Sequence, residues 1–169
     1  IQKSKHMPPT ITTLPVTKLI GMRVHMNFIT NRTQELWQKF MPRKNEIEGK
    51  VSNEQYSVEV YSSLSYFDQF NPATNFEKWA AVPVATIEDS PVGMESLIIP
   101  AGLYAVFPFK GLASEAPAMY QHILGNWLPN SKYQLDNRPH FAVMGEKYKN
   151  NDPDSEEELW IPIKPKSHE

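Results

Sequence analysis

The sequence predicts an α+β fold in which a strand–helix–strand–strand unit occurs twice. Two observations support this prediction. The order of alternating and helical segments repeats along the chain, and short motifs repeat with it. Phe40-Met41-Pro42 and Trp127-Leu128-Pro129 each follow a helical pattern, and a Trp-bearing strand with a proline closes each half. Internal duplication accounts for both, and it predicts pseudo-twofold symmetry with two helices on one face of a mainly antiparallel sheet.

The first repeat is expected over about residues 15–88. Alternating apolar side chains predict half-buried strands at residues 17–28, 56–61 and 78–86. Between the first two, Leu36, Trp37 and Phe40 recur at helical spacing and predict a short helix that ends near Pro42. We expect a long loop or a hairpin connection over residues 62–77. The N-terminal segment, residues 1–14, is polar, basic and proline-bearing and is expected to be loose.

The second repeat is expected over about residues 95–165. Strands are predicted at residues 95–110, 140–148 and 158–164. Met119, Ile123 and Trp127 recur at helical spacing, and Ser114 is the expected N-cap, with Pro117 in the first turn. Residues 15–165 are therefore expected to form one domain, with a cleft between the halves, where ligands often bind.

The composition excludes several classes of protein. The chain has 169 residues, 40% of them hydrophobic, which is too apolar for a disordered protein. It has no cysteine, so disulfide scaffolds and thiolate metal sites are excluded. The formal net charge of −2 argues against direct nucleic-acid binding through bulk charge. No apolar run is long enough to span a bilayer, and no signal peptide opens the chain, so we expect a cytoplasmic protein without membrane contact.

No catalytic or cofactor motif stands out. The sequence has no GxSxG, no phosphate-binding glycine loop, no GxGxxG and no HExxH. The five histidines form no ligand-spaced pair, so we expect neither a metal nor another cofactor. Two carboxylates are candidates for a pocket: Glu59, on the strand face shared with Ser57 and Tyr61, and Glu146, expected within a strand. The run Glu156–Glu158 is interpreted as a solvated turn.

Aromatic residues carry most of the functional signal, because they recur at matching places in both halves. Core packing accounts for many of them, but Trp and Tyr also have a polar tip that needs a partner when buried. A cleft lined by them would bind flat, apolar and often cationic molecules. With the carboxylates, the candidate ligand-binding residues are Trp127, Tyr104, Trp79, Glu59, Glu146, Tyr66, Phe67, Phe141 and Tyr148.

The second half resembles the gyrase-inhibitor-like (GyrI-like) small-molecule-binding family, which includes the effector-binding domains of bacterial drug-responsive transcription activators. The resemblance rests on residues 99–107, Asn126-Trp127-Leu128-Pro129, Arg138-Pro139-His140-Phe141 and residues 160–164. In the first half, Phe40-Met41-Pro42-Arg43 and residues 76–81 agree with stand-alone members. The resemblance covers roughly residues 15–165.

The resemblance implies a duplicated strand–helix–strand–strand fold that binds varied, often cationic or aromatic compounds in a central cleft. It implies that Trp127 and Tyr104 belong to the pocket, with Trp79 as the first-half candidate. Many members have a glutamate directly after the matched phenylalanine, where this sequence has Ala142. Glu59 or Glu146 would then supply the carboxylate, or the ligand is neutral.

We therefore expect a non-catalytic binding module for amphipathic or aromatic small molecules, acting in sensing or sequestration. The residues before Thr17 are too few for a helix-turn-helix unit, so a stand-alone module without its own DNA-binding domain is expected. Two alternatives stay open. One is a hydrolase of a reactive genotoxic compound that uses Glu146 or Glu59, as in some family members. The other is an interaction protein for a macromolecule such as gyrase.

Overall fold

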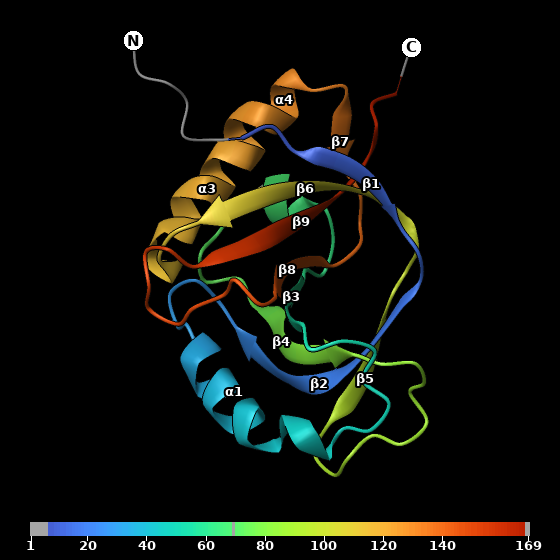
Figure 1. Cartoon of the computed structure of the whole chain (residues 1–169). Coiled ribbons are helices and arrows are strands. Elements are labelled where there is room, and N and C mark those ends of the chain that lie inside the picture. The colour runs from blue at the N-terminus through green and yellow to red at the C-terminus, as the bar shows by residue number, and fades with distance from the viewer. Residues whose placement is uncertain (1–6, 69, 168–169) are drawn as a thin grey trace.

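A curved antiparallel sheet forms the centre of the molecule, with helices on one of its faces (Figure 1). The computed structural model describes residues 7–68 and 70–167. The strands are β1 (Thr10–Leu14), β2 (Thr17–Met26), β3 (Gln55–Val60), β4 (Phe76–Pro83), β5 (Glu95–Ile99), β6 (Gly102–Lys110), β7 (Tyr133–Leu135), β8 (His140–Met144) and β9 (Glu156–Pro165). Their order is β1-β6-β9-β8-β3-β4-β2-β5, and β7 adds to β9.

The helices lie in matching places in the two halves. The first half has α1 (Thr33–Phe40), continued by the 3-10 helix η1 (Met41–Glu46), and the short α2 (Ser65–Asp68). The second half has η2 (Ala113–Glu115), α3 (Ala116–His122), a π-helical segment η3 (Ile123–Trp127) and α4 (Leu128–Asn130). The order β2–α1–β3–β4 is thus repeated as β6–α3–β8–β9, which confirms the predicted duplication.

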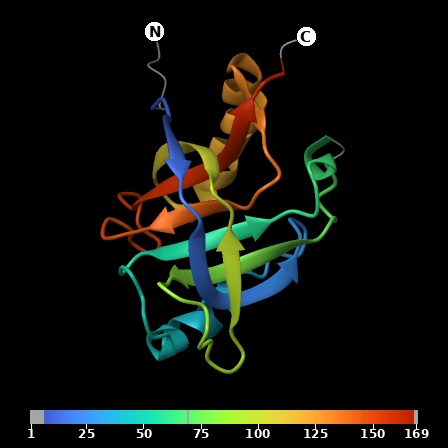
Figure 2. The same ribbon diagram turned by 90° about the vertical axis from the view of Figure 1, so that its right-hand side faces the viewer.

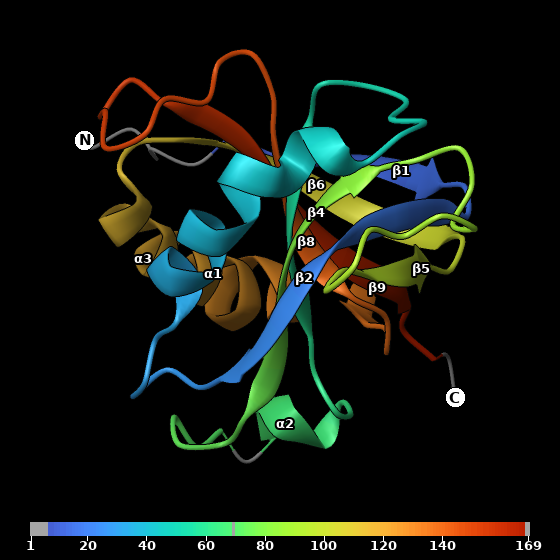
Figure 3. The ribbon, with the colours of Figure 1, turned by 90° about the horizontal axis from the view of Figure 1, so that it is seen from below.

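Side-chain alternation puts both main helices on the same face. Ala142 of β8 packs with Met119 and Ile123 of the α3 region, whereas Ala80 of β4 packs with Leu36 and Phe40 of α1. Ala142 and Ala80 are both register partners of Ser57 in β3, so the side chains of all three point to one side. We call this side the helix face, and Figure 3 shows α1 and α3 together on it.

The far face is covered by the chain itself. Each half begins with an arm, β1 or β5, that runs through a proline into its own long strand but pairs with the long strand of the other half. The register is the same in both places, since Leu14 faces Gly102 and Ile99 faces Thr17. Figure 2 shows the two continuous strands side by side, on the side away from the helices.

Three of the sequence expectations need correction. Within the N-terminal segment expected to be loose, Thr10–Leu14 form strand β1, while residues 1–6 lie outside the described residues. Residues 62–77 contain α2 as well as a loop. Ser114 is not an N-cap, because it lies within η2. No helix in the described ranges is long and apolar enough to cross a membrane.

Candidate functional site

The centre of the helix face has small side chains. Ala142, Ser57 and Ala80 lie in one row across β8, β3 and β4, and each is buried. The two alanines of this row pack against helix residues, Ala142 against Ile123 and Ala80 against Phe40. The chemistry of this face is therefore determined by polar side chains two residues further along these strands, at Glu59, Lys78 and His140.

A buried ion pair lies beside this row. Glu59 of β3 and Lys78 of β4 are register partners, and Glu59 Oε1 lies 3.5 Å from Lys78 Nζ. Their side chains are only 13% and 11% exposed. Glu59 Oε2 is buried and has no hydrogen-bond partner among residues 7–68 and 70–167. Burial raises the pKa of the Glu59 carboxyl, and the Lys78 ammonium only partly opposes that shift.

Two phenols lie within electrostatic range of Glu59. Tyr61 follows β3, and Tyr120 comes from α3. Burial raises the pKa of both well above its ordinary value, and the charge of Glu59 adds to the increase. Both hydroxyls therefore stay protonated near neutral pH, as neutral groups able to donate a hydrogen bond.

A second carboxylate, Glu157, faces the same cluster from β9. Burial raises its pKa to about 7, Glu59 adds to the increase and Lys78 opposes it. Glu157 therefore gains or loses its proton near neutral pH. We call Glu59, Lys78, Glu157, Tyr61 and Tyr120 the central polar cluster.

Flat rings close one end of the cluster. His140 is the register partner of Glu59 on the other side of β3. Phe67 of α2 stacks on the His140 ring at 5.3 Å, and Tyr61 meets it edge-on at 5.1 Å. The Tyr66 ring lies 4.6 Å from the Tyr61 ring, and the buried Tyr66 hydroxyl has no hydrogen-bond partner in the part of the chain that the structure describes. Burial, aided by the charge of Arg138, lowers the pKa of His140 to about 3, so its ring is neutral. We call Tyr66, Phe67 and His140 the aromatic wall.

Three other expected ligand-binding residues lie on the opposite face. Trp79, Tyr104 and Phe141 belong to one buried core cluster there. The Tyr104 hydroxyl donates to the Pro139 carbonyl at 2.8 Å, and Trp79 Nε1 donates to Glu77 at 3.0 Å. The sheet separates these rings from Glu59, so the structure does not bring them together with the central polar cluster.

Of the remaining expected residues, Tyr148 lies within electrostatic range of a member of the cluster, since partial burial and the charge of Glu157 raise the pKa of the Tyr148 hydroxyl. Trp127 ends η3, half-buried, with its ring edge-on to Phe107 at 5.1 Å and stacked on Tyr133 at 6.4 Å. Glu146 and Tyr148 are exposed in the turn after β8. The expectation that Glu146 lies within a strand is wrong, because β8 ends at Met144.

The sequence does not point to every member of the cluster. It predicts a solvated turn at Glu156–Glu158, but β9 begins at Glu156 and alternation points Glu157 toward the helix face. Lys78 shares its face with Ala80 and Val82, and this alternation is the signal that could have shown it to point inward. Its position opposite Glu59 could not be deduced, because it depends on the register between β3 and β4.

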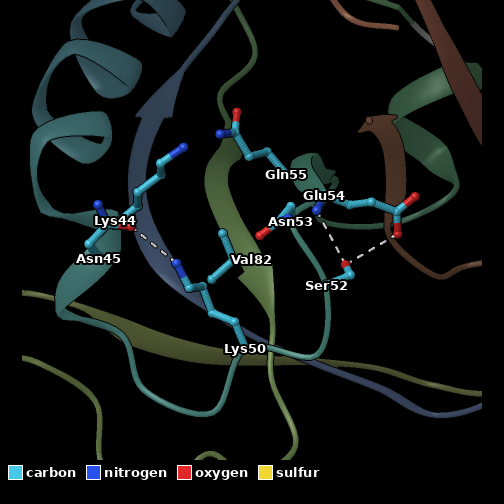
Figure 4. A pocket seen from close by; sticks show the side chains of 8 residues that line it. All are labelled: Lys44, Asn45, Lys50, Ser52, Asn53, Glu54, Gln55 and Val82. Carbon is cyan, nitrogen blue, oxygen red and sulfur yellow. Dashed lines mark hydrogen bonds between the residues drawn. The ribbon is translucent and has the colours of Figure 1, made fainter. Parts of the chain in front are cut away.

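A polar hollow lies at the other end of β3 (Figure 4). Lys50 Nζ donates to Asn45 Oδ1 at 3.2 Å, and the Ser52 hydroxyl donates to Glu54 Oε1 at 3.4 Å. Its lining consists of Lys44, Asn45, Lys50, Ser52, Asn53, Glu54, Gln55 and Val82. Its polar groups are paired with one another or exposed, in contrast to the buried Glu59 Oε2.

The model of the GyrI-like small molecule binding domain family matches residues 7–164. This chain belongs to that family. The transcriptional regulator BrlR of Pseudomonas aeruginosa is 28% identical to this GyrI-like chain over 165 residues. The match covers 94% of the chain and 56% of BrlR, so the chain spans little more than half of that relative's length.

Solved structures share the GyrI-like fold at low sequence identity. SAV2435 bound to tetraphenylphosphonium aligns with a TM-score of 0.61 at 14% identity, over 94% of both chains. EcmrR, in its complex with DNA, aligns with a TM-score of 0.68 at 12% identity, over 93% of this chain and 57% of EcmrR. The expected family and fold class are therefore confirmed.

Proposed function

We propose that this chain binds an amphipathic, partly aromatic small molecule on its helix face, and that binding serves sensing or sequestration. The observation that carries the proposal is the buried Glu59 oxygen, Oε2, to which no group of the described residues donates a hydrogen bond. A buried acceptor without a partner is costly, and a ligand that donates to it removes that cost. Tyr61 and Tyr120 add neutral hydroxyls, and the aromatic wall offers flat apolar surface next to them.

The relatives support a binding role. The structure of SAV2435 was solved with bound tetraphenylphosphonium, an aromatic compound. BrlR is a transcriptional regulator. EcmrR was solved in a complex with DNA. Sensing and sequestration both begin with the same binding step. For this reason the first test concerns binding itself and the face on which it occurs.

Isothermal titration calorimetry with acridone, a flat neutral compound, tests the proposal. Phe67→Ala removes a ring of the aromatic wall and should weaken binding by about tenfold, the effect of one stacked ring in a desolvated site. Trp160→Phe changes a half-buried ring on the opposite face and serves as the matched control, with unchanged affinity expected. The reverse result would place the ligand among Tyr104, Trp79 and Phe141. Absence of binding by acridone and related flat compounds would favour a macromolecular partner.

It stays a prediction that the ligand contacts Trp127 and the exposed side chains of Glu146 and Tyr148. Trp127 lies on the helix face but packs against Phe107 and Tyr133. Trp127→Ala in the same titration decides its role, since an unchanged affinity for acridone would limit it to packing.

A hydrolase is the second candidate, because Glu157 has a pKa of about 7. A carboxylate with that pKa can accept a proton from an attacking water near neutral pH. Glu59 stands in the same cluster, whereas Glu146 is exposed in a turn. Turnover of a reactive electrophile that is lost in Glu157→Gln while binding persists would support this candidate. Binding without turnover would contradict it.

A further inference from the structure

Lys78 already provides a positive charge at the carboxylate of the proposed site. Its ammonium lies 3.5 Å from Glu59 Oε1, and both side chains are almost fully buried. Lys78 sits on β4, an interior strand of the sheet, between Glu59 of β3 and Val24 of β2. Among these register neighbours only Glu59 offers the ammonium a countercharge.

The ion pair engages only one of the two oxygens of the Glu59 carboxylate. Glu59 Oε1 faces the ammonium, whereas the buried Oε2 has no hydrogen-bond partner. A permanent cation at this site would have to approach Lys78 as well as Glu59, and the repulsion is strong where the surroundings have a low dielectric constant. A neutral N–H or O–H group meets no such repulsion and can donate to Oε2.

We infer that Lys78 is a specificity-determining residue, which makes the site select flat neutral compounds with a hydrogen-bond donor over permanent cations. The inference rests on the proposed function, since it concerns the ligand class of the same site. It also separates this chain from SAV2435, which was solved with a cation, tetraphenylphosphonium.

Among the described residues, the other titratable groups that face the pair are three phenols, one imidazole, one guanidinium and one carboxyl group. Tyr61, Tyr120 and Tyr66 are neutral phenols, and His140 is a neutral ring. Arg138, which acts on His140, adds positive charge on that side. Glu157 is the group that could attract a cation instead, so every measurement is repeated in Glu157→Gln.

Three compounds with the same ring frame separate charge from hydrogen bonding. Acridone is neutral and has an N–H donor, N-methylacridone is neutral without the donor, and N-methylacridinium is a permanent cation. Calorimetry on the intact chain should give acridone an affinity about tenfold above that of either other compound, as expected for one satisfied buried acceptor.

Lys78→Met should reverse the charge preference. The Glu59 carboxylate then has no internal countercharge, so N-methylacridinium should bind at least about tenfold more tightly than to wild type. Acridone should change less. Lys78→Arg keeps the positive charge and is the matched control, with weak binding of the cation retained. Thermal unfolding checks that each variant is folded, and Lys78→Gln replaces Lys78→Met if the latter is not.

The outcomes are distinct. If wild type binds N-methylacridinium as tightly as acridone, or if neither neutral Lys78 variant gains affinity for the cation, the inference is overturned and the proposed function stands. Cation binding by wild type that disappears in Glu157→Gln overturns it too, because Glu157 would then set the charge preference. If none of the three compounds binds wild type or any variant, the proposed function itself fails.

Discussion

The two faces of the central strands differ in the size of their side chains. On the far face, large rings stack across neighbouring strands: Phe141 lies 5.2 Å from both Tyr56 and Trp160, nearly parallel to each. On the helix face, the corresponding row consists of Ala142, Ser57 and Ala80. The same strands thus build a core of stacked rings on one side, and on the other a row of small side chains that pack against the helices next to buried polar groups.

The polar atoms of the two faces differ in the same sense. The ring polar groups of Tyr104, Trp79 and Trp160 all donate to protein acceptors, at 2.8, 3.0 and 3.2 Å. Within the described residues, Glu59 Oε2 and the Tyr66 hydroxyl on the helix face are buried without a hydrogen-bond partner, and so is Arg138 Nη1, whose guanidinium lies over the Tyr104 ring. Aromatic content alone therefore does not distinguish a candidate site from a core; what sets the helix face apart is that a buried carboxylate oxygen is unpaired there.

Phe141→Ala should have the largest effect on stability. Phe141 is fully buried and contacts Tyr56, Tyr104 and Trp160, so its loss leaves a cavity in the far-face core. We expect the free energy of unfolding to fall by about 3–5 kcal/mol in urea denaturation. Val92→Ala, at a side chain that is 90% exposed, is the control and should change it little. A small effect of Phe141→Ala would mean that the far face is not a packed core.

The Glu59–Lys78 pair should show strong coupling. Replacing either residue alone by Met leaves a buried charge without its partner and should lower the free energy of unfolding by about 3 kcal/mol. Replacing both by Met should bring it back to within about 1 kcal/mol of wild type, because no buried charge remains. A double-mutant cycle in urea measures the coupling. Additive losses would show that the two side chains do not interact in solution.

Glu157 should make stability depend on pH. Its pKa is raised from 4.5 to about 7 in the folded protein, so between these values the folded state holds a proton that the unfolded state has lost. Stability therefore falls as the pH rises through this window, and Glu157→Gln removes the decline. Allowing for partial exposure, the variant should be about 1–2 kcal/mol more stable than wild type at about pH 8 and nearly equal at about pH 4. Equal stability of the two proteins at both pH values would contradict the burial of Glu157.

Glu146→Gln and Tyr148→Ala should have the smallest effects. Both residues are exposed in the turn after β8, although partial burial and the charge of Glu157 raise the pKa of the Tyr148 hydroxyl. We expect changes within about 0.5 kcal/mol in the free energy of unfolding, and unchanged affinity for acridone. A loss of acridone binding in either variant would extend the site into this turn.

The sequence was sufficient to predict the repeated fold, but it did not reveal every helix and strand. The alternation at Thr17–Met26 and the spacing of Leu36 and Phe40 come from burial in core clusters, and they predicted β2 and α1 correctly. The arm β1 was missed because most of its side chains are exposed, so it has no alternating pattern. The helix α2 was missed because it has only four residues.

The site was less predictable, because it depends on pairing between distant strands. Glu59 was recognised from its own strand, but Lys78 becomes its partner only through the register of β3 with β4. A shift of one residue would move every ring of these strands to the other face. For this reason the sequence could not show that Phe67 stacks on His140, the register partner of Glu59. Nor could it show that Tyr104 and Trp79 lie on the opposite face.

The exchanged arms have a consequence for the origin of the chain. Each half lends its first strand to the other half, in the same register, and receives one in return. A single half on its own would have an arm without a strand to pair with and a long strand without its neighbour. Two separate copies would complete each other, so the present chain has the geometry of a strand-swapped dimer whose subunits have become covalently joined.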